Sequence, residues 1–204
     1  MTKKWTTAVT ALCLALGLTG AGAGSAQAAT AGQVAAHRLT PRQPAFSGAN
    51  MLTSGTFEGS IAGWQKLVPA GGIVNWANYN TLAGAPAPAY DGTGYLATNT
   101  NIVGGSVYQD VPITLGSSGT VEASVFLSSQ SGPATGTFCL WGLISGSNPI
   151  STCSGYSVNS STGYGNYILI TQIPVGVTTL RFQIYPTANG GTTDLDDASL
   201  FQIG

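Results

Sequence analysis

The feature that most constrains the fold of this chain is a series of short segments rich in β-branched and aromatic residues. They are separated by Gly, Ser, Pro and Asn and lie at 106–115, 120–129, 135–144, 166–173 and 178–186. This composition and length are typical of β-strands. No window of a dozen residues combines a 3.6-residue apolar period with helix caps. The sequence therefore predicts an all-β protein, an antiparallel sandwich or barrel, because a parallel sheet would need crossover helices.

Alternation within these segments separates a core face from an outer face, since successive side chains of a strand point to opposite sides. The positions predicted for the core are Val121, Ala123, Val125, Leu127, Phe138, Leu140, Leu180, Phe182 and Ile184. The opposite positions place Phe126, Trp141, Arg181, Gln183 and Tyr185 on outer faces. Large aromatic residues on an outer face are either covered by loops or form a binding surface.

The start of the chain predicts a secretory signal peptide. Lys3 and Lys4 precede an apolar run over residues 8–18, and residues 26–28 form an A-x-A cleavage pattern. The apolar run is too short to span a bilayer comfortably, so we expect cleavage of residues 1–28 and no membrane insertion. The mature protein is expected to be secreted and extracellular.

The rest of the chain predicts a leader and one domain. Residues 29–49 are small and polar and contain two prolines, which indicates a flexible leader, and residues 50–204 suffice for a single domain. The one histidine, His37, lies in the leader, so the domain lacks a Ser-His-Asp or Cys-His arrangement. A glycosidase needs two placed carboxyl groups, and Glu122 with Asp110 is the one pair that stays open. We therefore expect no enzymatic activity.

Charged residues are scarce. Six basic and seven acidic residues make up 6% of the chain, against about 25% in typical globular proteins. Without the two lysines of the signal peptide the balance is four basic against seven acidic residues, a net charge of −3. Such a surface does not attract polyanions, which argues against nucleic acid and anionic membranes as partners. It suits a neutral partner rich in hydroxyl groups.

Cys139 and Cys153 are the cysteines that remain after the signal peptide. In an exported protein two cysteines most often form one disulfide. It would close a loop of about 15 residues and contribute about 3 kcal/mol to stability. A free, reactive pair is the alternative.

Five motifs follow one another along the domain: NMLTSGTFEGSIAGW (50–64), YDGTGYLAT (90–98), SVYQDVPI (106–113), LRFQIYP (180–186) and DLDDASL (194–200). In this order and spacing they resemble the CenC-like carbohydrate-binding modules of the galactose-binding-like jelly-roll superfamily. The resemblance implies an antiparallel β-sandwich (jelly roll) that binds carbohydrate without chemical change. The alternative is a secreted structural or protein-interaction sandwich at the cell envelope, because the superfamily also includes domains that bind no sugar.

The resemblance also implies a structural calcium ion. In this fold the first and last strands lie side by side, which brings Glu58 near the acidic residues Asp194, Asp196 and Asp197. Clustered carboxylates repel one another, and Ca²⁺ resolves the conflict with six to eight oxygen ligands. The implied ligands are Glu58 and Asp196, with Asp197 as a further candidate and a backbone carbonyl near Gly94. Asp196 is expected to point into the sandwich and Asp197 out of it.

Sugar binding is expected to use aromatic and polar side chains, because pyranose rings stack on Trp and Tyr while their hydroxyls form hydrogen bonds. The candidates are Trp76, Tyr79, Trp141, Arg181, Gln183 and Tyr185. Tyr156 and Tyr164, in Gly/Ser-rich segments, are further candidates for the rim, and Gln109 faces either the site or the interior. Trp64 occupies a family position that usually packs in the core. The expected partner is a polysaccharide or glycan, and the protein is expected to be a monomer.

Overall fold

The computed structural model describes residues 48–203, except 82–83, 115–117 and 146–148. The predicted signal peptide (1–28), His37 and nearly all of the predicted leader (29–49) lie outside the described residues. The described residues belong to one unit, Gln43–Gly204.

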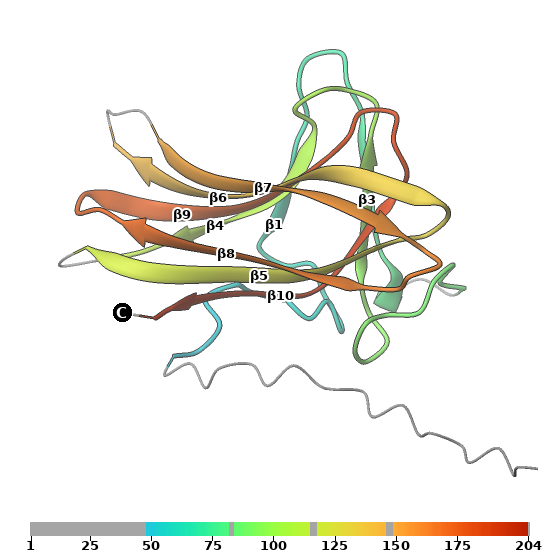
Figure 1. The fold of residues 1–204 in the computed structure, drawn as a ribbon, viewed down its shortest axis with the longest axis horizontal. Helices are drawn as coiled ribbons and strands as arrows, with labels where there is room; N and C mark the ends of the chain where they lie inside the picture. Colours follow the sequence, from blue (N-terminus) through green and yellow to red (C-terminus); the bar gives the residue numbers. More distant parts are fainter. Residues whose placement is uncertain (1–47, 82–83, 115–117, 146–148, 204) are drawn as a thin grey trace, which may run out of the picture. The chain divides into compact units, whose positions relative to one another are not determined.

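Ten strands in two sheets and one turn of 3-10 helix, η1 (Tyr79–Thr81), make up the regular structure of the described residues. Sheet A contains, in spatial order, β1 (Trp64–Leu67), β4 (Ser106–Pro112), β9 (Val177–Pro186), β6 (Pro133–Ile144) and β7 (Ile150–Asn159). Sheet B contains β2 (Val74–Asn78), β3 (Leu96–Thr100), β10 (Thr193–Gln202), β5 (Gly119–Ser129) and β8 (Gly165–Ile173). All strand pairs are antiparallel. The predicted antiparallel sandwich is confirmed, with β6 and β9 in the upper layer and β5 and β10 in the lower layer of Figure 1.

The described part of the chain contains no helix that is long and apolar enough to cross a membrane.

All five segments predicted as strands are strands, namely β4, β5, β6, β8 and β9. The sequence analysis did not predict the short strands β1, β2 and β3, and it also missed the longer β7, which it treated as a Gly/Ser-rich segment. The outward positions of β7 are Ser, Cys and Gly, so its period is visible only from inward residues such as Tyr156 and Val158. Tyr156 is buried in the core, with its hydroxyl 3.1 Å from Oγ1 of Thr193. Its prediction as a rim residue is wrong.

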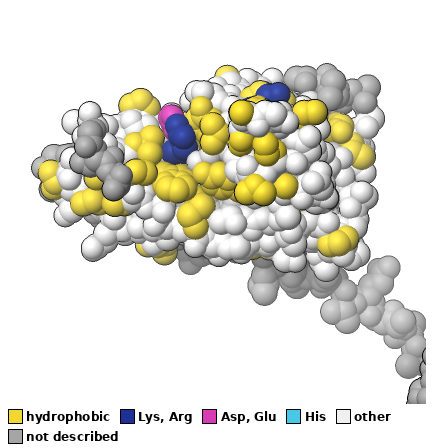
Figure 2. All heavy atoms as spheres, turned by 90° about the horizontal axis from the view of Figure 1, so that it is seen from above, with side chains coloured by type: hydrophobic (Ala, Val, Ile, Leu, Met, Phe, Trp, Pro, Cys, Tyr) yellow, Lys and Arg dark blue, Asp and Glu magenta, His cyan; other side chains and the backbone are white. Residues whose placement is uncertain are grey.

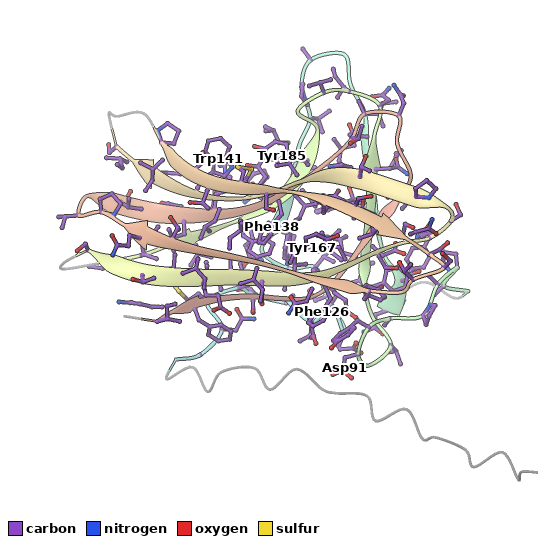
Figure 3. The ribbon with its side chains drawn as sticks, in the orientation of Figure 1. Asp91, Phe126, Phe138, Trp141, Tyr167 and Tyr185 are labelled. Carbon is purple, nitrogen blue, oxygen red and sulfur yellow. A yellow bond between two sulfur atoms is a disulfide. The ribbon has the colours of Figure 1, made fainter. Side chains whose placement is uncertain are left out.

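The core lies between the sheets and is built from the faces that alternation predicted. All nine predicted core residues are buried, with at most 1% exposure. Figure 3 shows Phe138 between the two layers. Trp64 packs edge-on against Phe182, with ring centroids 5.7 Å apart, which confirms it as a core residue. Gln109 faces the interior, where its side chain both accepts from the Thr53 N–H and donates to the Thr53 carbonyl.

The N-terminal segment lies beside β10, but it is not the first strand that the resemblance implied, since β1 belongs to sheet A and pairs with β4. The Met51 N–H donates to the Leu200 carbonyl, and the Ala198 N–H donates to the Gly55 carbonyl, each at 2.9 Å. The side chain of Asn50 adds bonds to the carbonyl of Ala198 and the N–H of Leu200. The N-terminal segment thus occupies the edge of β10 beyond Leu195, where the pairing of β10 with β3 ends.

Residues 84–95 form a loop, called here the covering loop, that packs on the outer face of sheet B. Its Tyr90 stacks on Phe126 of β5 with ring centroids 3.6 Å apart. Tyr95 at its end is fully buried and stacks on Tyr79. Phe126 was predicted on an outer face, and it lies there beneath the covering loop.

Candidate functional site

The outer face of sheet A gathers side chains from its three central strands. Register places Asp110 of β4, Arg181 of β9 and Trp141 of β6 in one row across the sheet. Tyr185 lies two rows further along β9, on the same side as Arg181. Figure 3 shows Trp141 and Tyr185 above the upper layer, pointing away from the core. These side chains point outward because Leu180, Phe182 and Ile184, which alternate with them, fill the core.

An ion pair lies in this row. Arg181 donates from Nε to Oδ1 of Asp110 at 2.7 Å and from Nη2 to Oδ2 at 2.8 Å, and the two side chains are 24% and 31% exposed. The hydrogen bonds that Arg181 donates to Asp110 are the main reason that the pKa of Arg181 is raised. The guanidinium also lies over the ring of Tyr108, 4.2 Å from its centroid. Figure 2 shows this face from above, with a basic and an acidic side chain in contact near a group of hydrophobic ones.

Two further polar side chains of this face are held by neighbours. Gln183, predicted to bind sugar, is 1% exposed and donates from Nε2 to Oγ of Ser106 at 2.7 Å. The hydroxyl of Tyr108 donates to Oε1 of Gln65 at 2.8 Å. These bonds fix the polar groups in place, but they leave Gln183 little surface for a ligand.

Trp141 and Tyr185 are both half-buried, and their polar atoms approach each other. Burial is the main cause that raises the pKa of the Tyr185 hydroxyl, while the charge of Arg181 and the indole N–H of Trp141 lower it. The indole N–H nevertheless has no partner of hydrogen-bond geometry among the described residues. The indole nitrogen is inaccessible to solvent, so it is not a donor that a ligand on this face can reach while the side chain keeps this position.

An open cleft of about 550 Å³ lies beside Tyr185. It is lined by Val103 and Gly104, by Thr135, Gly136, Thr137 and Cys139 of β6, and by Tyr185, Pro186, Thr187 and Ala188. The predicted disulfide is present, since Cys139 and Cys153 stand opposite each other on β6 and β7 with Cα atoms 4.1 Å apart. The disulfide ties these strands together at the edge of the cleft.

The other two aromatic candidates lie on sheet B. Trp76 of β2 packs against the edge of the core, and the Nζ of Lys66 is 5.4 Å from its ring centroid. Tyr79 and Trp76 line a separate pocket of about 140 Å³ with Gln130 and neighbouring Asn and Thr residues. Tyr164 contacts Tyr90 of the covering loop edge-on. The predicted set is therefore divided: Trp141, Arg181, Gln183 and Tyr185 share one face, and Trp76 and Tyr79 do not join them.

The carboxyl pair left open for catalysis does not form. Asp110 faces outward from sheet A, where it binds Arg181. Glu122 lies on β5 opposite Phe201 and Ile170, on the outer face of sheet B. The two carboxyl groups are on opposite outer faces of the sandwich, so they cannot flank one glycosidic bond.

Two of the predicted metal ligands bind the backbone of residues 90–94, in the second half of the covering loop. Oε1 of Glu58 accepts the N–H groups of Thr93 and Gly94, each at 2.9 Å. Oδ2 of Asp196 accepts the N–H groups of Tyr90 and Asp91 at 2.8 and 3.2 Å. Glu58 and Asp196, far apart in sequence, thus bind the same short stretch of backbone. Burial alone would raise the pKa of Glu58, but the bonds from Gly94 and Thr93 outweigh it and lower the pKa.

The direction of Asp196 differs from the prediction. A β-bulge between Asp196 and Ser199 interrupts the alternation of β10. Asp196 therefore stands opposite Phe126 on the outer face, beneath the covering loop, instead of pointing into the sandwich. It is fully buried there, and burial raises its pKa to about 7.

Asp197, predicted to point outward, lies within the bulge at a φ of 44° and is half-buried. Burial raises its pKa first, and the charges of Asp91 and Glu58 raise it further. Figure 3 shows Asp91 at the tip of this region. Within the described ranges, no three His, Cys, Asp or Glu side chains lie close enough to hold a metal ion by themselves. A cation here would need backbone oxygens as well.

Asp194 takes no part in this group. It is fully buried, and neither carboxylate oxygen has a partner of hydrogen-bond geometry in the described part of the protein. Burial raises its pKa to about 7, although the nearby amide of Gln130 lowers it.

The sequence analysis did not name Tyr108 and Asp91 as site residues. Tyr108 alternates with Val107 and Gln109, so the rule that placed Arg181 outward also places Tyr108 outward. Strand alternation could not have identified Asp91, because this residue lies in the covering loop.

Solved structures of similar fold include carbohydrate-binding modules. The CBM22-1 xylan-binding domain of Paenibacillus barcinonensis Xyn10C covers 78% of this chain and 97% of its own length, at 17% identity and a TM-score of 0.56. TmCBM61 in complex with β-1,4-galactotriose covers 76% of this chain and 99% of its own length, at 15% identity and a TM-score of 0.51. At this identity the likeness shows the fold: this protein has the jelly-roll sandwich of carbohydrate-binding modules.

A third similar structure is an enzyme domain. The enzymatically active domain of tailspike protein 4 from Bacteriophage CBA120 covers 76% of this chain, at 14% identity and a TM-score of 0.53, and the chain spans 21% of its length. No protein-family model matches the chain, and its sequence matches no curated protein.

Proposed function

We propose that this protein is a secreted, non-catalytic carbohydrate-binding protein of the CenC-like type. Its ligand, a polysaccharide or glycan, binds on the outer face of sheet A. The observation that carries the proposal is the grouping of Trp141 and Tyr185 with Arg181 beside an open cleft. The fold shared with the xylan-binding and galactotriose-bound modules supports the same conclusion.

The chemistry of this face suits a sugar. The half-buried rings of Trp141 and Tyr185 provide apolar surface for the C–H face of a pyranose. The guanidinium hydrogens outside the ion pair supply donors for its hydroxyls. Because the strands and the disulfide hold these groups in place, little conformational entropy is lost on binding.

Three further properties belong to the proposal. The separation of Asp110 from Glu122 supports binding without hydrolysis. The disulfide fits secretion, because disulfides persist in oxidising compartments. We also propose that the protein acts as a monomer.

Binding to insoluble cellulose, xylan, chitin and β-glucan tests the proposal directly. We expect retention on at least one of them, and a loss of about tenfold in affinity for Trp141→Ala, as expected when a stacking ring is removed. Trp76→Ala is the matched control, because it removes the same side chain from sheet B and leaves the proposed face intact. Equal losses in both variants would contradict the placement of the site.

A protein-interaction role is the alternative. Ile168 and Ile170 of β8 are 51% and 57% exposed on the outer face of sheet B, which favours contact with another protein. If no polysaccharide retains the wild type, this alternative becomes the better explanation.

We also propose a structural Ca²⁺ held by Glu58, Asp196 and Asp197 with backbone oxygens near Gly94. Support comes from the shared contacts of Glu58 and Asp196 with residues 90–94. Burial raises the pKa of Asp197 most, and the charges of Asp91 and Glu58 raise it further; a cation would relieve this repulsion. When bound, the ion would supply positive charge and tie the N-terminal segment, the covering loop and β10 together.

Thermal unfolding in calcium and in EDTA tests this site. At a calcium concentration of 100 Kd the expected stabilisation is about 2.7 kcal/mol. Glu58→Gln should abolish the calcium-dependent shift, whereas Asp110→Asn, on the opposite sheet, should preserve it. An identical melting temperature in calcium and EDTA for the wild type would contradict the proposal.

A further inference from the structure

We propose that the outer face of sheet A selects uncharged glycans, and that Asp110 sets this selectivity by neutralising Arg181. The inference rests on the proposed function, because it names the class of glycan that the same face binds.

The first argument is that the positive charge on this face is already paired with a carboxylate of the protein. Among the residues that the structure describes, Lys66 and Arg181 are the basic ones. Lys66 lies over Trp76 and does not belong to the row of side chains on the face. Arg181 donates its Nε hydrogen and one hydrogen of Nη2 to the two carboxylate oxygens of Asp110. The fork that would bind a carboxylate or sulfate of an acidic sugar is therefore already occupied.

The second argument is the position of Asp110. Its carboxylate is partly exposed beside Arg181, in the same row as Trp141. Arg181 lies between Trp141 and Asp110 in this row, so an acidic group on a sugar stacked at Trp141 would meet a guanidinium whose charge this carboxylate already balances. The Nη1 hydrogens of Arg181 are not used in the ion pair, so they can donate to neutral hydroxyls.

The third argument concerns the aromatic surface. The guanidinium covers the ring of Tyr108 at 4.2 Å, which removes that ring as a stacking surface. Stacking is left to Trp141 and Tyr185. Tyr108, Arg181 and Asp110 then form a polar wall of zero net charge beside these two rings.

The experiment compares two derivatives of one polysaccharide, the best-binding uncharged polymer of the retention assay. Its hydroxyethyl derivative is neutral, and its carboxymethyl derivative carries negative charge at similar size. Affinities are measured by titration calorimetry at low and moderate salt for the wild type, Asp110→Asn and Glu122→Gln. Glu122→Gln is the matched control, because it changes net charge equally on the opposite face of the sandwich.

For the wild type we expect about tenfold weaker binding to the carboxymethyl derivative. Asp110→Asn should remove most of this difference, because it frees the guanidinium fork, and its gain should shrink with salt. Glu122→Gln should behave as the wild type.

The ratio of the wild-type affinities for the hydroxyethyl and carboxymethyl derivatives tests the selectivity even if a variant fails to fold. Equal affinity for both derivatives overturns the selectivity but leaves glycan binding intact. Equal gains in Asp110→Asn and Glu122→Gln overturn the role of Asp110, because net charge would then explain both. If the wild type binds neither derivative and no parent polymer, the proposed function fails together with the inference.

Discussion

The outer faces of the two sheets are built from the same kind of alternating strands but differ in what lies on them. The covering loop packs on sheet B and buries Tyr95 and the carboxylates of Asp194 and Asp196. On sheet A, Arg181 and Trp141 keep part of their surface exposed. Substituting a polar group under the covering loop on sheet B is therefore expected to change the stability of the fold. Substituting one on the outer face of sheet A can change ligand binding.

The largest expected difference between the faces is in stability after loss of a tyrosine ring. Tyr95→Ala should destabilise the protein by about 3 to 5 kcal/mol, because it removes a fully buried ring that stacks on Tyr79. Tyr185→Ala on the half-buried face should cost about 1 kcal/mol. Urea unfolding of both variants measures the contrast. Tyr95→Phe, which keeps the ring, should lose much less, and equal losses for Tyr95→Ala and Tyr185→Ala would show that the two faces are not different.

A smaller loss of stability is expected when the disulfide of sheet A is removed. The double substitution Cys139→Ser with Cys153→Ser should lower the free energy of unfolding by about 3 kcal/mol, because it releases a loop of about 15 residues in the unfolded chain. Binding should survive in the folded fraction, since β6 and β7 remain paired along their length. Thermal unfolding and polysaccharide retention check the two parts, and loss of binding in a folded variant would indicate that the disulfide shapes the face directly.

The smallest expected effect is the pH dependence of the free energy of unfolding that arises from Glu122, on the outer face of sheet B. Burial raises the pKa of this carboxyl above its ordinary value of 4.5. Its contribution to stability is therefore fully present below pH 4.5 and is lost as the pH rises through the folded pKa. Glu122→Gln should be more stable than the wild type by up to about 1 kcal/mol at pH 8, with no difference at pH 4. Chemical unfolding at both pH values measures this, and a difference that does not change with pH would exclude titration as its cause.

Alternation predicted much of the candidate face, because it depends only on local strand geometry. It placed Trp141, Arg181 and Tyr185 outward and Phe138 and Phe182 inward, as the structure has them. It failed at Asp196, where the bulge of β10 changes the side of the sheet that a residue faces. A bulge depends on the partner strand, so the sequence of one strand does not reveal it.

Trp76 shows the second limit. Its sequence surroundings resemble those of a binding aromatic, and its chemistry is that of Trp141. The order of the strands placed it in sheet B, away from the other candidates. Strand order is a long-range property, which no local pattern encodes.

The sequence by itself determined the class of fold, the residues of the core, the disulfide pair and the low charge of the surface. These follow from composition and from a period of two residues along each strand. Only the tertiary structure decided which outward residues share a face, that Arg181 is neutralised by Asp110, and that the covering loop packs on sheet B. The reason is physical: contacts between distant strands depend on register and loop packing, which arise when the whole chain folds.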